Sequence, residues 1–292
     1  MSHPAEKLAR AILAALICAG VKDVVYCPGS RSAPFAYALD AVCRAGHLRA
    51  HVRLDERSAA FLALGLSRAG RSEEDGAESE PELSAPRSCL CPAPVAIITT
   101  SGGAVAELHA GVAEAKHSRL PLLVISADRP AEMRGVGASQ TTSQPGIFSS
   151  HALEVLDLPA ETAPDQSLNA RVRRLLAHAE GIPTGTPGPV QLNVAFREPL
   201  TPEGGSITPA PFLLERESTK VLRAPTPRVE WKEAVREGMR TLILAGDGAD
   251  PAASIWASRA SPSPQAASPG MRTPSPTSSP SCPGPSPEAS NR

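Results

Sequence analysis

The sequence has few aromatic residues and no surplus of charge of either sign. Aromatic side chains make up 3% of the 292 residues, and 29 Lys and Arg are balanced by 30 Asp and Glu. A chain with a formal net charge of −1 has no general electrostatic attraction to nucleic acid or to an anionic membrane. We therefore expect no nucleic-acid partner and expect recognition to depend on local groups.

Patterns typical of secretion and of membrane insertion are also missing. The six cysteines include no C-x-x-C pair, which favours a reducing compartment. The apolar run at 9–21 contains Arg10 and is shorter than the roughly 20 residues that span a bilayer. Glu6 precedes this run, which argues against a signal peptide. These features predict a cytoplasmic protein without an integral membrane segment.

Metal-ligand spacing is equally scarce. Cys89 and Cys91 have no second cysteine pair nearby, and His109 and His117 lack acidic residues at ligand spacing. From the residues alone we predict no metal site.

The sequence does contain a regular alternation of strand and helix patterns. Apolar residues at helical spacing and β-branched runs, bounded by Gly, Pro and Ser, give the order of elements. Such alternation predicts an α/β fold with a parallel sheet and helices on both faces. The predicted strands are 23–27, 51–54, 95–100, 121–126 and 189–194, the predicted helices are 6–19, 33–44, 55–70, 104–119 and 167–180, and 128–150 is a predicted loop.

Composition divides the chain into a main domain and a following part that is rich in Pro and Ser. We expect a domain over 1–200, interrupted at 71–94 by an acidic, Ser/Pro-rich flexible insert. A Pro-rich linker at 201–228 leads to 229–250, which is typical of the first strand and turn of a second α/β domain. Pro and Ser make up half of 251–292, so we expect a disordered tail and an incomplete second domain.

Polar groups gather where the predicted strands end, and ligands of parallel α/β sheets bind beyond that edge. Glu56 is the most suggestive of these groups, because it begins a helix directly after a strand. A carboxyl there is expected to be partly desolvated, which raises its pKa and suits it to share a proton. The alternative is a carboxylate satisfied by backbone N–H groups at the helix N-terminus.

Three arginines follow predicted strands and offer planar, bidentate donors to carboxylates. Arg31, Arg129 and Arg134 are candidates to bind a small anionic substrate, and the alternative for each is a structural or surface role. The segment 135–140 begins like a dinucleotide fingerprint but has Gln140 in place of the third glycine and no preceding strand. An unrelated nucleotide-binding module is therefore disfavoured.

Five ordered blocks carry a more specific signal. They are CPGSRSAPFAYAL (27–39), HVRLDERSAAFLALGLSRA (51–69), VAIITTSGGAVAELHAGVAEA (95–115), PLLVISADRPAEMRGVGASQTTSQPGIFSSH (121–151) and GPVQLNVAFREPL (188–200). Together they closely resemble the N-terminal, pyrimidine-binding domain of the 2-succinyl-5-enolpyruvyl-6-hydroxy-3-cyclohexene-1-carboxylate (SEPHCHC) synthases of menaquinone biosynthesis. The order and spacing of five blocks make this resemblance more specific than any single motif.

The resemblance implies a thiamine diphosphate-dependent transferase. Such an enzyme decarboxylates 2-oxoglutarate and adds the succinyl carbanion to isochorismate in a conjugate addition. It also implies a homodimer or tetramer, and a divalent ion, Mg²⁺ or Mn²⁺, that grips the diphosphate on a further domain. We expect that domain to be missing from this chain.

The resemblance also assigns residues. Glu56 matches the carboxyl that hydrogen-bonds N1′ of the aminopyrimidine, and Gln140 matches a glutamine at the reacting centre. The other implied contacts are to the cofactor from Pro28, Gly29, Thr100, Ser101 and Gly102, and to substrate from Ser30, Arg31, Ser32, Arg129, Ser139 and Gln140.

Some positions depart from the family's pattern. Gly103 stands where the family usually has Thr, and Ser139 where it usually has Asn. The motif at 246–248 matches the family's metal-binding GDG only in its letters, since the next asparagine is Asn291. A second hypothesis is therefore a catalytically inactive truncated fragment that lacks the diphosphate and metal domain.

Overall fold

The computed structural model describes residues 3–69, 94–182 and 184–201. The chain divides into two units, Met1–Val229 and Glu230–Arg292, and all described residues belong to the first. Apart from residues 94 and 201, the predicted insert, linker, second-domain start and tail lie outside the described residues. Among the described residues, no helix combines the length and the hydrophobicity needed to cross a bilayer.

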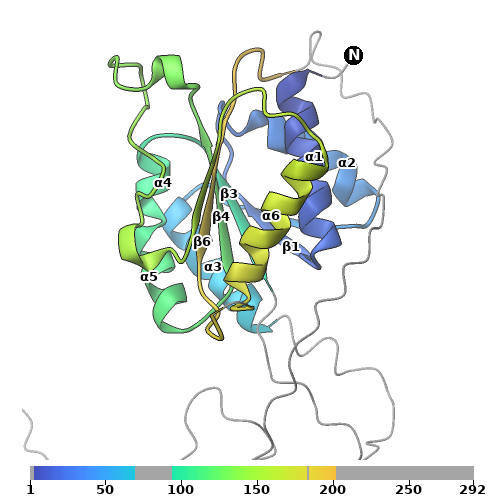
Figure 1. Ribbon diagram of the computed structural model, residues 1–292, viewed down its shortest axis with the longest axis vertical. Coiled ribbons are helices and arrows are strands. Elements are labelled where there is room, and N and C mark those ends of the chain that lie inside the picture. Colours follow the sequence, from blue (N-terminus) through green and yellow to red (C-terminus); the bar gives the residue numbers. More distant parts are fainter. Residues whose placement is uncertain (1–2, 70–93, 183, 202–292) are drawn as a thin grey trace, which may run out of the picture. The chain divides into compact units, whose positions relative to one another are not determined.

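The described residues form a six-stranded sheet in which all strands run parallel (Figure 1). The strand order is β2-β1-β3-β4-β6-β5. This confirms the predicted parallel sheet. The strands are β1 (Asp23–Tyr26), β2 (Arg49–Val52), β3 (Val95–Thr99), β4 (Leu122–Asp128), β5 (Val155–Leu158) and β6 (Val190–Ala195).

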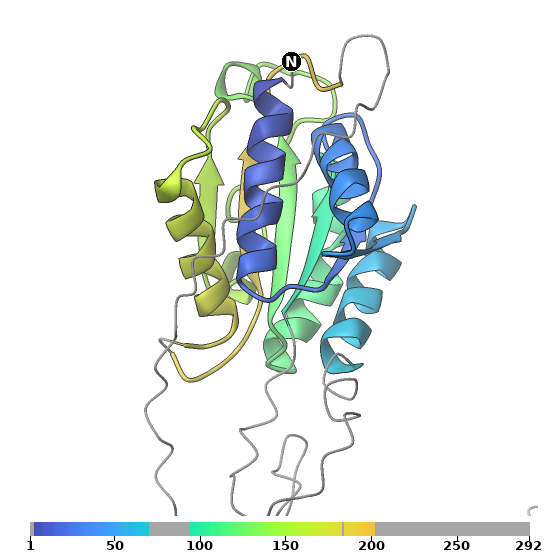
Figure 2. The ribbon, with the colours of Figure 1, turned by 90° about the vertical axis from the view of Figure 1, so that its right-hand side faces the viewer.

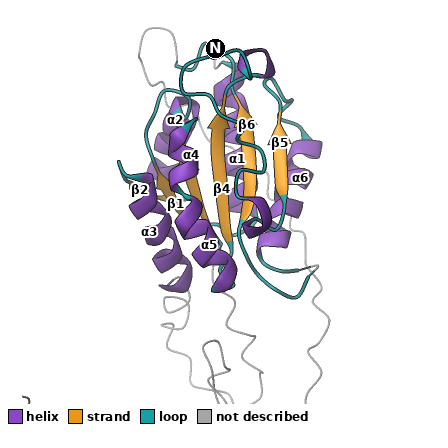
Figure 3. Ribbon diagram, turned by 90° about the vertical axis from the view of Figure 1, so that its left-hand side faces the viewer, coloured by secondary structure: helices purple, strands orange, loops and turns teal. Residues whose placement is uncertain are grey.

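Helices cover both faces of the sheet. Figure 2 shows α1 (Pro4–Cys18), α2 (Ala33–Arg44) and α6 (Gln166–Ala179) in front of one face. Figure 3 shows α3 (Glu56–Ala69), α4 (Gly103–Glu107) and α5 (His109–His117) on the other. The short 3-10 helices η1 (Ala131–Met133) and η2 (Ser149–His151) lie in the segment between β4 and β5.

Two apolar clusters, one on each face of the sheet, form the core. The first joins α1, α2 and α6 to the sheet, and the second joins α3, α4 and α5 to it. All residues of β1, β3, β4 and β6 are buried, as expected for strands covered on both faces. On α1 the apolar residues at helical spacing, Leu8, Ile12 and Leu16, are almost completely buried.

Two predicted elements differ clearly from the observed ones, and one observed strand was not predicted. Strand β2 begins two residues earlier than predicted, because its Arg49 pairs with Asp23 of β1. Burial of the Asp23 carboxyl acts to raise its pKa. The hydrogen bonds and charges of Arg49 and His51 act in the opposite direction, and together they hold that pKa below its ordinary value. The predicted helix 104–119 is divided at Leu108 into α4 and α5, and strand β5 was not predicted.

The direction of the connections marks one edge of the sheet. Strand β1 leads into α2 on one face, whereas β3 leads into α4 on the opposite face (Figures 1 and 3). In open parallel sheets, ligands bind beyond the carboxyl ends of neighbouring strands whose connections diverge in this way. The turns that follow β1 and β3 are therefore where a ligand is expected.

Candidate active site

Glu56 is the first residue of α3, and the residue before it fixes where that helix begins. Asp55 accepts a hydrogen bond at Oδ2 from the Ser58 amide at 2.8 Å, and its carbonyl accepts one from the Ser58 hydroxyl at 3.0 Å. This side chain satisfies one of the N–H groups that a helix N-terminus leaves unpaired. The cap sets Glu56 in the first turn of α3, as the sequence predicted.

The Glu56 carboxyl faces the end of β3. Its side chain is partly buried, and Oε1 accepts a hydrogen bond from the Thr99 hydroxyl at 3.3 Å. It also lies close enough to Cys27 at the end of β1 to affect that thiol, whose pKa is raised to about 12 by burial and then by the charges of Glu56 and Asp55. Glu56 is therefore held between the ends of β1 and β3.

Cys27 gives a chemical readout of this arrangement. A pKa near 12, against an ordinary 9.0, leaves about a thousandfold less thiolate at pH 8, and only the thiolate is alkylated. We expect iodoacetamide at pH 8 to modify the partly buried Cys18 at least a hundredfold faster than Cys27, measured by peptide mass spectrometry. Equal rates would contradict the placement of Cys27, and denatured protein should react at both sites.

The turn after β1 packs directly on the turn after β3. A Cβ atom added to Gly29 would lie 2.4 Å from Cβ of Thr100, so only glycine permits this approach. Gly102 has a φ of +80°, and a Cβ there would lie 2.7 Å from Cγ of Gln140. The two glycines thus bring the predicted 28–32, 100–102 and 140 segments together.

Arg31 is buried in the turn after β1, with 6% of its surface exposed. Its Nη1 donates to the Phe196 carbonyl at 2.9 Å, and its Nη2 lies 3.8 Å from the exposed Glu198 carboxylate. Its Nε is buried and has no hydrogen-bond partner among the described residues. Burial and then the nearby charge of Arg129 lower the pKa of Arg31. The Arg31 guanidinium therefore keeps one N–H group, at Nε, without an acceptor among the described residues.

Arg129 connects the turn after β3 with the loop after β4. Its Nη1 donates to the Ser101 hydroxyl and, at 2.6 Å, to the Gln140 carbonyl. Together with its effect on Arg31, this places two guanidinium groups at the same edge of the sheet. The arrangement can attract carboxylates.

The remaining predicted residues divide into exposed and internal ones. Pro28 and Ser30 are exposed, as are Ser139 and Gln140. Ser32 is fully buried, and its hydroxyl donates to the carbonyls of Cys27 and Gly29, so the Ser32 side chain holds the turn. Ser101 is likewise fully buried and bonded to Arg129. The predicted ligand contacts of these residues stay predictions.

A buried polar network below this edge was not predicted from the sequence. Ser126 of β4 donates to Oδ1 of Asn193 on β6 at 2.8 Å, and Asn193 Nδ2 donates to Asp128 at 2.9 Å and to Asp157 at 2.7 Å. Gln191 donates to Ser126 at 3.1 Å and to the Gln144 carbonyl at 2.9 Å. The network fastens the segment after β4 to the sheet.

Arg134 belongs to this network. Its Nη2 lies 2.8 Å from Oδ2 of Asp128, which is fully buried, and its Nη1 lies 3.1 Å from Asp157. Of the two alternatives considered for Arg134, these contacts favour the structural one. Spacing gave no signal for the network, because its members come from β4, β5, β6 and the loop.

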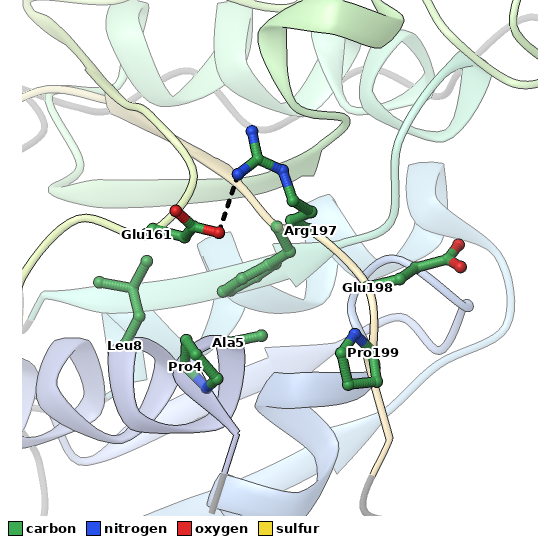
Figure 4. Close-up of a pocket in the computed structure, with 8 residues that line it drawn as sticks. Pro4, Ala5, Leu8, Glu161, Arg197, Glu198 and Pro199 are labelled. Atoms are coloured by element: carbon green, nitrogen blue, oxygen red, sulfur yellow. Dashed lines mark hydrogen bonds and ion pairs between the residues drawn. The ribbon is translucent and has the colours of Figure 1, made fainter.

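Figure 4 shows a small pocket whose lining does not include Glu56. It measures about 60 Å³, and Arg197 on its rim pairs with Glu161 at 2.8 Å. None of the predicted site residues lines it, although Arg31 contacts two of its lining residues. The lining residues are Pro4, Ala5, Leu8, Glu161, Phe196, Arg197, Glu198 and Pro199.

The two histidines considered as metal ligands, His109 and His117, lie close to a third histidine, His151. Nε2 of His109 on α5 is 3.2 Å from Nδ1 of His151, and His117 packs edge-on against the same His151 ring. Across the part of the chain that the structure describes, no group of three or more His, Cys, Asp or Glu residues is arranged to hold a metal ion.

Comparison with known proteins relates this fold to a class of enzymes. Residues 6–148 match the family model described as "Thiamine pyrophosphate enzyme, N-terminal TPP binding domain". This part of the chain is therefore similar to the N-terminal domain of thiamine pyrophosphate enzymes. Within that class, its sequence is similar to proteins named 2-succinyl-5-enolpyruvyl-6-hydroxy-3-cyclohexene-1-carboxylate synthase.

Three such relatives show the extent of the similarity. The synthase of Kineococcus radiotolerans is 44% identical over 254 residues, which cover 86% of this chain and 40% of the relative. That of Paenarthrobacter aurescens is 41% identical over 254 residues, covering 85% and 39%, and that of an Arthrobacter species is 42% identical over 258 residues, covering 87% and 38%. The chain thus spans about 40% of the length of these relatives.

Proposed function

We propose that residues 1–200 bind the aminopyrimidine ring of thiamine diphosphate and take part in the synthesis of SEPHCHC from 2-oxoglutarate and isochorismate. When bound, thiamine diphosphate supplies the electron sink for decarboxylation of a 2-oxo acid. The Glu56 carboxyl holds a proton at N1′ of the ring. The remaining residues bind and orient the substrates.

The position of Glu56 is the observation that carries this proposal. A carboxyl can share a proton with a ring nitrogen only if it is shielded from bulk water and kept in one place. Glu56 is partly buried and accepts a hydrogen bond from Thr99, which supports this role.

The arginines fit the substrates' charge. 2-Oxoglutarate and isochorismate each carry two carboxylates, and Arg31 and Arg129 bring two guanidinium groups to the edge of the sheet. The unpaired Nε of Arg31 is a donor that a carboxylate oxygen would satisfy. Gln140 lies against Gly102 at the same edge of the sheet, and we propose that its side-chain amide acts at the reacting centre.

The metal and the assembly complete the proposal. A divalent ion, Mg²⁺ or Mn²⁺, would bind the diphosphate, and we place none of its ligands among the residues of the first domain. We propose a homo-oligomer, a dimer or tetramer, that works in the cytoplasm. These points follow from the resemblance to the synthase family given above.

Isochorismate consumption tests the proposal. The chain, thiamine diphosphate, Mg²⁺, 2-oxoglutarate and isochorismate are mixed, and isochorismate loss is followed by absorbance. In parallel, a hybrid carries residues 1–200 in place of the matching part of the Kineococcus radiotolerans synthase.

We expect the hybrid to consume isochorismate only when both thiamine diphosphate and 2-oxoglutarate are present. A folded hybrid that binds the cofactor but remains inactive would contradict the proposal. Turnover by the chain itself would rule out the inactive-fragment hypothesis.

A further inference from the structure

Gln144 is a fully buried side chain that the proposed reaction does not use. Its amide nitrogen donates to the Ala127 carbonyl at 3.2 Å and to Oδ1 of Asn193 at 3.1 Å. Its amide oxygen accepts a hydrogen bond from the Gly102 N–H at 2.8 Å. Gln144 thus joins β4, β6 and the turn after β3.

The surrounding network permits only one orientation of this amide. The two groups that Nε2 faces are oxygen acceptors, and the group that Oε1 faces is a donor. The Asn193 amide is itself fixed, because its Oδ1 also accepts from Ser126 while its Nδ2 donates to Asp128. A reversed Gln144 would set N–H against N–H and oxygen against oxygen, which costs free energy in a buried site.

The Gly102 amide held by Gln144 lies next to three candidate site residues, Ser101, Arg129 and Gln140. Gly102 contacts Gln140, and the neighbouring Ser101 accepts a hydrogen bond from Arg129. The same Arg129 donates to the Gln140 carbonyl. Displacement of Gly102 would therefore move Ser101 and Gln140 together relative to Arg129.

We propose that Gln144 is a positioning residue, whose amide holds the Thr100–Gly102 turn and Gln140 in the geometry required to bind thiamine diphosphate. The ligand in this statement rests on the proposed function, whereas the positioning of the turn does not. Gln144 acts on the site through the Gly102 amide, whereas Asp128 of the same network holds the Arg129 amide.

Hydrogen exchange at Gly102 tests the positioning in the ligand-free chain. Gln144→Met keeps a similar length but cannot accept from Gly102, so we expect amide exchange in the peptide containing Gly102 to accelerate at least about tenfold. Val172→Ala, on the buried face of α6, controls for a general loss of stability. Gln166→Met, at an exposed position of α6, controls for the change from Gln to Met. Both should leave exchange at Gly102 unchanged.

Gln144→Glu adds a readout that packing alone would not produce. An ionised carboxylate at this position would face the Ala127 carbonyl and Asn193 Oδ1 without a proton to donate, and burial favours its neutral form. We expect Gly102 protection in Gln144→Glu to recover toward wild type between pH 8 and pH 5.5, after correction for intrinsic exchange. Gln144→Met should show no such recovery.

Binding of thiamine diphosphate with Mg²⁺, measured by titration calorimetry, links the turn to the ligand. We expect Gln144→Met to weaken binding about tenfold, as for one misplaced hydrogen-bonding group, and Val172→Ala not to weaken it.

Unchanged Gly102 exchange in Gln144→Met, or equal acceleration in Val172→Ala, would overturn the positioning role. Accelerated exchange with unchanged binding would overturn the link to the ligand. Because the diphosphate and metal ligands are placed outside this domain, the titration uses the hybrid with the Kineococcus radiotolerans synthase. Absence of binding by a folded hybrid with the wild-type residues 1–200 would count against the proposed function, while exchange would still decide the positioning of the turn.

Discussion

In the hybrid that carries residues 1–200 within the full-length Kineococcus radiotolerans synthase, Glu56→Gln is expected to slow exchange of the C2 proton of bound thiamine diphosphate by about a hundredfold or more. General acid–base groups typically contribute factors of this size, and an amide cannot share a proton with N1′. The amide oxygen that replaces the carboxylate can still accept the Thr99 hydrogen bond, so the fold and the position of α3 should be retained. The measurement is deuterium incorporation at C2, quenched in acid and followed by proton NMR.

The matched control is Glu107→Gln, on the exposed surface of α4. It removes the same charge from a helix on the same face of the sheet but should leave C2 exchange at the wild-type rate. If Glu56→Gln binds thiamine diphosphate and exchanges C2 within about twofold of wild type, then Glu56 does not hold the N1′ proton. The proposed function would then lose its main support.

Asp128→Ala is expected to lower the free energy of unfolding by about 3 kcal/mol, because it breaks a buried ion pair. Asp128 is fully buried and accepts from the Arg129 amide at 2.7 Å, from Asn193 at 2.9 Å and from Arg134 at 2.8 Å. Removal of the carboxylate leaves the buried Asn193 amide short of an acceptor and Arg134 with Asp157 alone. Urea denaturation at pH 7 measures the change.

A surface ion pair gives the comparison. Asp40 pairs with Arg44 one helical turn later on α2, where the Arg44 side chain is 72% exposed. Asp40→Ala should therefore change the free energy of unfolding by about 0.5 kcal/mol or less. A loss at Asp128 no larger than at Asp40 would show that the network contributes little to stability.

The four buried strands could be predicted from the sequence, whereas the edge strand β2 was predicted with shifted bounds and β5 was not predicted. Strands β1, β3, β4 and β6 are buried on both faces and appear in the sequence as mainly apolar runs, although β6 contains Gln191 and Asn193. The edge strands β2 and β5 are partly exposed and lack that pattern. The start of β2 depends on Arg49 and Asp23, which are distant in sequence, so local periodicity could not place it.

The site divides in the same way. Glu56 was predictable because its signal is local: a capping residue, a helix start and a preceding strand. Its match to a family motif added the chemistry. Gln144 and Asn193 carry no local signal, since their hydrogen bonds depend on the pairing of β4 with β6 and on the path of the loop. The available clue was the presence of Gln191 and Asn193 in the otherwise apolar strand β6, and it did not extend to Gln144 in the loop.

Arg31 shows what the site costs the folded protein. Its guanidinium is removed from water, sits near a second cation and keeps one N–H group without an acceptor among the described residues. Nη1 is satisfied by the Phe196 carbonyl and Nη2 lies near Glu198, so Nε is the group that a ligand could still satisfy. If a carboxylate bound there, the folded domain would be stabilised by mass action as the ligand concentration rises.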